Sequence, residues 1–131
     1  MINFDDKYFQ KINFTKEQIN YYFSSAKRDL EIAKESKRVE VVFKFSYDAL
    51  IKLGIALIAE KGRKVRSAQG HHIKILEKMS KILKNEEIEI LGNKIRQDRN
   101  HDLYDGEMTI SEKQTKEYLK FVAELFHKLQ K

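Results

Sequence analysis

The chain contains no proline in its 131 residues. Sheet proteins use proline at turns and edge strands, whereas a proline inside a helix removes a backbone hydrogen bond and clashes with the preceding turn. A bundle of long helices therefore has less use for proline than a sandwich or a barrel of this length. The absence of proline indicates an all-α fold.

Apolar residues recur at helical spacing in five segments that are separated by turn and capping residues. Thr15 and Gln18 form the sequence pattern of a capping box before the first segment, and Ser111 and Gln114 repeat it before the last. Gly62 follows the second segment as a natural stop. We expect helices over residues 15–36, 39–61, 71–83 and about 86–104, where Asp105 and Gly106 break the helix, and a last helix from residue 111 to about residue 129.

The second segment, residues 39–61, is apolar on nearly every side. Such a helix either lies at the centre of its bundle or is covered on a second face by another subunit. The expected architecture is an antiparallel bundle of about five helices, with a four-helix up-and-down core and one short additional helix. Residues 1–131 form a single domain. Its N-terminal extension, residues 1–14, is expected to hold a short helical turn capped by Asp5 and Asp6.

Composition limits the location and the partners of the protein. No apolar run of about 18 residues or more occurs, so no membrane span is expected. The chain begins with acidic residues where a signal peptide would be basic, and it has no cysteine. We therefore expect a cytoplasmic protein without disulfides. The net charge of +6 favours encounter with phosphates, although the lysines are spread along the chain.

Arg96 and His101 are the pair that most directly indicates chemistry. An arginine can hold a phosphate in a rigid fork, and a histidine can move a proton near neutral pH. Together they suffice to cleave RNA without a metal, because the histidine assists attack by the ribose 2′-hydroxyl and the arginine stabilises the developing charge. Five residues on a regular helix place the two side chains about 140° apart. They converge only if the helix frays or a second subunit supplies half of the site.

A structural explanation of the same segment is that Arg96, Asp98, Arg99 and Asp102 form a solvated, salt-bridged helix end. His71 and His72 are adjacent and diverge by about 100° on a helix, so we expect them to shape the entry into the third helix and not to bind a metal.

Three aromatic residues of the second segment are assigned to the core and not to base stacking: Phe43, Phe45 and Tyr47.

The loop over residues 62–70 is expected to be exposed and mobile. It carries Arg63, Lys64 and Arg66, which are candidates for contacts with RNA phosphates. A solvated turn is the alternative explanation of these three cations. No metal and no cofactor are expected.

The order of features along the chain resembles the HEPN domain family over about residues 15–130. These features are the sequence DALIKLGIALI from Asp48 on a buried second helix, the loop after Gly62, the Gly-His-His run from Gly70, and an Arg, Asn, His and Tyr cluster at the end of the fourth helix. The resemblance implies an antiparallel helical bundle that dimerises through its motif-bearing helices. It also implies metal-independent endoribonuclease activity in many members, often in toxins.

The family signature is an arginine, then four to six residues, then a histidine, with a polar residue commonly after the arginine. In one register Arg96 is followed by four residues and His101, but Gln97 is not among the usual Asn, Asp or His. This register implies an active site in which His101 is the general acid and base.

In the other register Arg99 and Asn100 match the arginine and polar residue, but Tyr104 and Asp105 stand where the histidine is expected. The resemblance implies that such branches have lost the catalytic histidine, and a tyrosine of ordinary pKa is a poor general base. In related toxins a tyrosine near the histidine is modified with AMP by a partner nucleotidyltransferase, although Tyr104 lies one position further on. A half-buried aromatic that completes the core is the simpler role for Tyr104.

The sequence therefore leaves three hypotheses. The first is a HEPN-like homodimer that acts as an endoribonuclease or toxin-type RNA-binding protein. The second is a catalytically silent HEPN module that binds a nucleotide or a small nucleotidyltransferase antitoxin of the MNT type. The third is a helical scaffold unrelated to the family. The candidate catalytic residues are Arg96, Arg99, Asn100, His101 and Tyr104, and the candidate RNA contacts are Arg63, Lys64 and Arg66.

Overall fold

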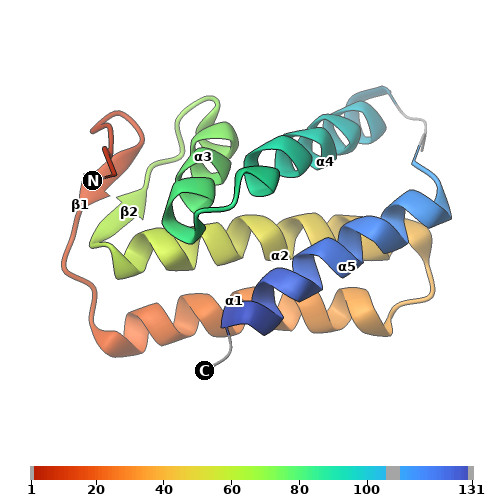
Figure 1. Ribbon diagram of the computed structural model, residues 1–131, viewed down its shortest axis with the longest axis horizontal. Coiled ribbons are helices and arrows are strands. Elements are labelled where there is room, and N and C mark those ends of the chain that lie inside the picture. The colour runs from red at the N-terminus through yellow and green to blue at the C-terminus, as the bar shows by residue number, and fades with distance from the viewer. Residues whose placement is uncertain (1, 106–109, 130–131) are drawn as a thin grey trace.

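The computed structural model describes residues 2–105 and 110–129, and the side chains of residues 2–101 and 110–129. Within these residues it has five helices and one two-stranded sheet, which confirms the all-α fold class (Figure 1). None of the described helices is long and apolar enough to cross a membrane. The elements are β1 (Phe9–Lys11), α1 (Lys16–Glu35), α2 (Val39–Glu60), β2 (Arg63–Val65), α3 (His71–Leu83), α4 (Glu86–Asp105) and α5 (Glu112–Leu129).

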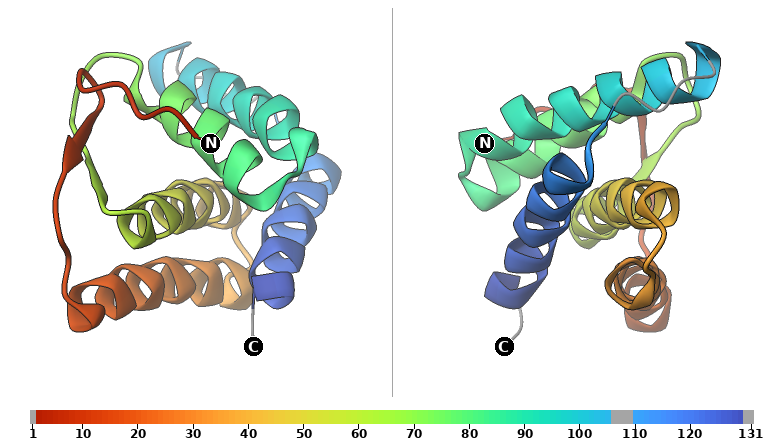
Figure 2. Two further views of the ribbon diagram at one scale, coloured as in Figure 1. Left: turned by 60° about the vertical axis from the view of Figure 1, so that its left-hand side comes forward. Right: turned by 90° about the vertical axis from the view of Figure 1, so that its right-hand side faces the viewer.

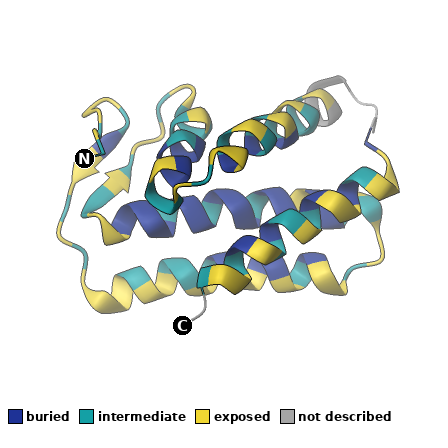
Figure 3. Ribbon diagram, in the orientation of Figure 1, coloured by how far each residue is buried: buried dark blue, intermediate teal, exposed yellow. Residues whose placement is uncertain are grey.

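The helix α2 lies at the centre of the bundle. Viewed along α2, α1 packs on one side, the α3–α4 pair on the opposite side, and α5 runs obliquely past α1 and α2 (Figure 2). Thirteen of the 22 residues of α2 are buried, and the buried colour covers most of its length (Figure 3). The apolar character of residues 39–61 is therefore explained within one subunit.

The ends of α1 and α5 follow from their capping boxes. Thr15 Oγ1 accepts a hydrogen bond from the backbone N–H of Gln18, and Gln18 Oε1 accepts from the N–H of Thr15, so two amides at the start of α1 are satisfied. Ser111 and Gln114 make the same reciprocal pair before α5. These contacts explain why both helices begin within a residue of the expected positions.

The extension before α1 and the segment after α2 differ from the expectation. Residues 9–11 form β1, which pairs antiparallel with β2 and sets Phe9 opposite Val65. The carbonyl of Asp5 accepts hydrogen bonds from the N–H groups of Tyr8 and Phe9, so a turn is present, but a strand and not a helix follows it. Phe9 is fully buried in the core. The start of residues 62–70 is therefore a paired strand, which the expectation of a loop did not include.

The helices α3 and α4 form a hairpin with a two-residue connection. Lys84 adopts a left-handed conformation (φ 53°), and Ser80 Oγ donates to the carbonyl of Asn85 at 2.9 Å. Gly54 of α2 lets α3 approach closely, because a β-carbon there would meet the side chains of Ile75 and Met79. The hairpin sets the first turn of α3 against the second half of α4.

Candidate functional site

A pocket of about 640 Å³ lies where the first turn of α3 faces α4. Its volume is within the range of small-molecule sites. Two arginines and two histidines line it, and none of its lining residues is acidic. We call it the cationic pocket. Its lining residues are Ser67, Ala68, Gln69, Gly70, His71, His72, Ile73, Arg96, Arg99 and Asn100.

The second half of α4 supplies one wall of the cationic pocket. Arg96, Arg99 and Asn100 stand three and four residues apart, so a regular helix places them on one face. All three are half-buried. Arg96 Nε donates a hydrogen bond to Asn93 Oδ1 at 3.1 Å, and the Arg99 guanidinium lies 5.5 Å from the ring centre of Tyr47. These contacts hold both guanidinium groups close to the pocket.

Tyr47 and His72 form a hydrogen-bonded pair beside these arginines. The Tyr47 hydroxyl lies 2.8 Å from His72 Nδ1, and Tyr47 is only 1% exposed. The His71 ring packs edge-on against His72 at 4.4 Å, and the His71 Nδ1–H donates to the carbonyl of Ala68. His72 is thus fixed from two sides where it lines the pocket.

The protonation states of this pair follow from burial and from the charges nearby. Burial, followed by the neighbouring His71 and Arg99, lowers the pKa of His72 to about 4. Burial also raises the pKa of Tyr47 well above its ordinary value. At neutral pH Tyr47 is therefore protonated and His72 is neutral. When the phenol donates to Nδ1, the ring proton of His72 is on Nε2.

His101 lies outside the cationic pocket. The helix α4 is continuous from residue 86 to residue 105, so Arg96 and His101 point in different directions on one subunit. His101 is exposed on the same face of α4 as Ile90, Lys94 and Gln97. The fraying that would bring Arg96 and His101 together in one subunit is therefore not observed.

Tyr104 and Asp102 belong to α4, but their side chains lie outside the described residues. Asp98 is described, and it faces α5. Its Oδ2 accepts a hydrogen bond of 2.7 Å from the hydroxyl of Tyr118. Asp98 is therefore held by a phenol of α5, and the part of the salt-bridged alternative that involves Asp102 lies outside the described side chains.

Two of the three candidate basic residues that follow α2 contact the N-terminal segment through their side chains. The Arg63 guanidinium lies 5.5 Å from the ring centre of Phe4, and Arg66 Nε donates to the carbonyl of Asp6 at 2.9 Å. Lys64 is exposed. None of the three lines the cationic pocket, but the chain immediately after Arg66 forms one of its walls.

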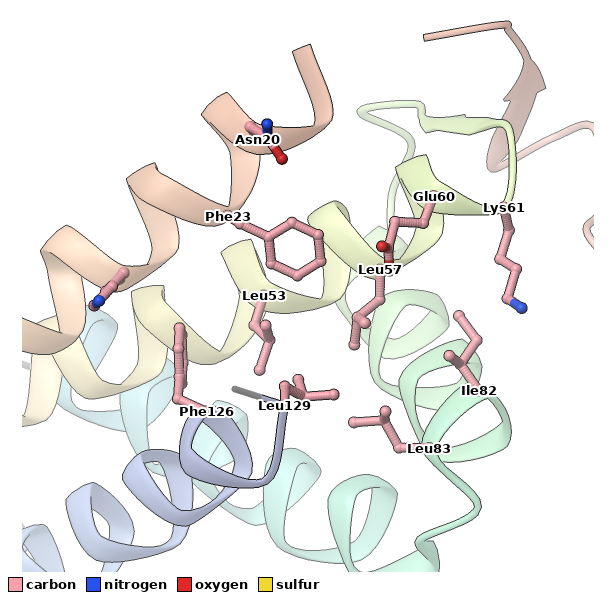
Figure 4. A pocket seen from close by; sticks show the side chains of 11 residues that line it. Asn20, Phe23, Leu53, Leu57, Glu60, Lys61, Ile82, Leu83, Phe126 and Leu129 are labelled. Atoms are coloured by element: carbon pink, nitrogen blue, oxygen red, sulfur yellow. The ribbon is translucent and has the colours of Figure 1, made fainter. Parts of the chain in front are cut away.

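A second cavity of about 740 Å³ lies between α1, α2, α5 and the end of α3 (Figure 4). Figure 4 shows its apolar side chains gathered around a common space, with polar groups towards the edges. None of the candidate residues from the sequence lines this cavity. Its lining residues are Asn20, Phe23, Lys27, Leu53, Leu57, Glu60, Lys61, Ile82, Leu83, Phe126 and Leu129.

No cluster of three or more histidine, aspartate and glutamate side chains suited to a metal is found in the part of the chain that the structure describes. No family model matches the chain, and no curated protein or solved structure is significantly similar to it. The inference of a function therefore rests on the cationic pocket and not on similarity to a known protein.

Proposed function

We propose that this protein is a HEPN-like module that binds a nucleotide phosphate in the cationic pocket. The observation that carries the proposal is that Arg96, Arg99 and Asn100 share one face of α4 and line a pocket opposite the first turn of α3. The resemblance offers these residues in its two alternative registers, Arg96 in one and Arg99 with Asn100 in the other. Their placement together is what supports the proposal.

The chemistry of the lining fits a phosphate. Each guanidinium can donate two parallel hydrogen bonds to phosphate oxygens, and Asn100 offers a further donor. The N-terminal end of α3, at His71 and His72, adds the positive end of a helix dipole. The pocket lining contains no carboxylate that would repel an anion.

For a single subunit, binding of a nucleotide phosphate is better supported than cleavage of RNA. The general acid and base expected from the sequence, His101, is exposed on another face of α4. The histidine that lines the pocket, His72, has a pKa lowered to about 4, which makes it a weak base at neutral pH.

The test is equilibrium binding of adenosine nucleotides and a short RNA to the wild type, Arg99→Gln and Arg28→Gln. Arg28 is exposed on α1 and is a matched control for the loss of one arginine charge. We expect Arg99→Gln to weaken binding about tenfold or more, because a charge-assisted hydrogen bond contributes about 1.5–3 kcal/mol. Binding should also weaken with added salt. Equal affinities for the two variants would contradict the proposal.

A second candidate function is the endoribonuclease homodimer. It is favoured by the exposed face of α4, where Ile90 is 71% exposed and His101 is accessible to a second copy of the chain. In this case a dimer through α4 would complete the site across the interface. The nucleotidyltransferase partner stays a prediction, since the Tyr104 side chain lies outside the described residues.

The dimer is tested by sedimentation of the wild type and Ile90→Lys, followed by RNA cleavage assays with His101→Ala. A dimeric wild type that cleaves RNA, a monomeric Ile90→Lys and an inactive His101→Ala are the expected results for the endoribonuclease. A His101→Ala protein that cleaves RNA at the wild-type rate would exclude His101 as the catalytic base.

A further inference from the structure

We infer that the cationic pocket holds the terminal phosphate monoester of a nucleotide, with Arg96 and Arg99 facing its two negative charges and His72 donating a hydrogen bond from Nε2. The inference deepens the proposed function and rests on it. It selects the end of an RNA or a free nucleotide over the internal phosphodiesters of an RNA chain. Tyr47 acts through His72 as a positioning residue.

The first argument is the match of charge. The pocket has two guanidinium groups and no lining carboxylate. The nearby acids are engaged elsewhere, since Asp98 accepts from Tyr118 and Asp48 pairs with Lys44 at 2.8 Å. A phosphate monoester carries about 1.5–2 negative charges at neutral pH, whereas a phosphodiester carries one. Two fixed positive charges therefore complement the monoester better.

The second argument is the tautomer of His72, which its hydrogen bond with Tyr47 sets. A buried tyrosine needs a partner for its hydroxyl, and Tyr47 has His72 Nδ1 at 2.8 Å. Because Nδ1 is occupied, Nε2 is the ring nitrogen that His72 can offer to a ligand in the pocket it lines. The proton on Nε2 makes it a neutral donor. The pair thus supplies a directed hydrogen bond without a third positive charge.

The third argument concerns pH. In the ligand-free protein, burial and the positive neighbours keep His72 neutral at pH values well above 4. The phosphate monoester loses its second charge as the pH falls through about 6. Between pH 8 and pH 5 the affinity for a monoester should therefore fall on acidification relative to that for a diester. The titratable and charged groups that act on His72 are Tyr47, Asp48, His71, Arg96 and Arg99.

The experiment measures the binding of four ligands to the intact protein by calorimetry. They are AMP, adenosine, a short RNA with a 5′-phosphate, and the same RNA with a 5′-hydroxyl. We expect the phosphorylated RNA to bind about tenfold more tightly than the hydroxyl form, by the contribution of a charge-assisted hydrogen bond. The affinities for AMP and for the phosphorylated RNA, when compared, distinguish a free nucleotide from an RNA end. Tight binding of either ligand supports the inference.

Variants test the role of His72 separately. His72→Gln keeps an amide donor near the position of Nε2 and should retain most of the affinity for the monoester, whereas His72→Leu should lose it. Tyr47→Phe keeps the buried ring but releases Nδ1, so it should weaken monoester binding several-fold. Nitrogen-15 spectra should show the Nε2–H tautomer of His72 in the wild type and a tautomer mixture in Tyr47→Phe. Circular dichroism checks that each variant is folded.

The outcomes separate this inference from the function on which it rests. Equal affinity for the phosphorylated and hydroxyl RNAs, together with equal affinity for AMP and adenosine, would overturn the monoester inference and leave RNA-phosphate binding in place. A monoester affinity that rises on acidification relative to the diester, and does not rise in His72→Gln, would show that His72 binds as a cation and would overturn its role as a neutral donor. Failure of all four ligands to bind the wild type would overturn the proposed function itself.

Discussion

The hydroxyl group of Tyr118 donates a hydrogen bond of 2.7 Å to Oδ2 of Asp98, which joins α5 to the stretch of α4 between Arg96 and Arg99. Burial, and then the hydrogen bond to Asp98, raises the pKa of Tyr118 well above its ordinary value, so the phenol stays a donor. The contact also holds the Asp98 carboxylate towards α5. The Asp98 carboxylate is therefore paired with Tyr118, and the positive charges of the neighbouring Arg96 and Arg99 remain available to a ligand in the pocket.

We expect Tyr118→Phe to lower the free energy of unfolding by about 1–3 kcal/mol, because the half-buried Asp98 loses a hydrogen-bond donor. Urea denaturation measures the effect. Tyr21→Phe is the matched control, since Tyr21 is 66% exposed and should change stability little. Equal effects of the two substitutions would show that the Tyr118–Asp98 contact contributes nothing.

His72 should make stability depend on pH. Its pKa is lowered from an ordinary 6.5 to about 4 in the folded protein, so on acidification the unfolded chain takes up the proton first. Its contribution to stability is complete above pH 6.5 and is lost as the pH falls towards 4. Urea denaturation of the wild type and His72→Gln over this range measures the difference. The wild type should lose more stability than the variant, and parallel curves would contradict the lowered pKa.

Gly54→Ala should destabilise the protein by about 1–3 kcal/mol through overpacking. The added β-carbon would lie 2.6 Å from Met79 Sδ and would also meet Ile75. The helix-forming tendency of alanine offsets part of this loss. A double-mutant cycle with Met79→Ala, measured by thermal denaturation, should show that the shortened side chain relieves the clash. Additive effects would mean that the Met79 side chain does not contribute to the clash.

Phe9→Ala should lower the free energy of unfolding by about 3–5 kcal/mol, because Phe9 is fully buried although it precedes the first helix. Its ring packs edge-on against Phe4 at 5.3 Å between centroids. Gln10→Ala, at the exposed next position of β1, is the control. A Phe9→Ala protein as stable as this control would show that the N-terminal segment is dispensable.

The helices could be predicted from the sequence because each carries local signals. The side chains of Thr15 and Ser111 cap helices from within the same segment, and the apolar stripes extend over several turns. The strand pair could not be predicted in this way. β1 and β2 have three residues each, which is too short for a periodic pattern, and their partners are far apart in the sequence.

The candidate site could be predicted in part. The face shared by Arg96, Arg99 and Asn100 follows from helical spacing alone. The pairing of Tyr47 with His72 depends on how α2 and α3 pack, so no local pattern reveals it. One signal was available, because a tyrosine in an almost wholly buried helix needs a hydrogen-bond partner for its hydroxyl.

Arg66 makes two hydrogen bonds to the start of the chain, from its backbone N–H to the carbonyl of Tyr8 and from Nε to the carbonyl of Asp6, 60 residues away. The helix hairpins are held by contacts between neighbouring segments, whereas this junction joins segments that are far apart in the sequence and has a larger loop-closure entropy cost. The segment after Arg66 is a wall of the cationic pocket. One wall of the pocket is therefore anchored to the start of the chain, and a ligand that orders this wall should also stabilise the docking of the N-terminal segment.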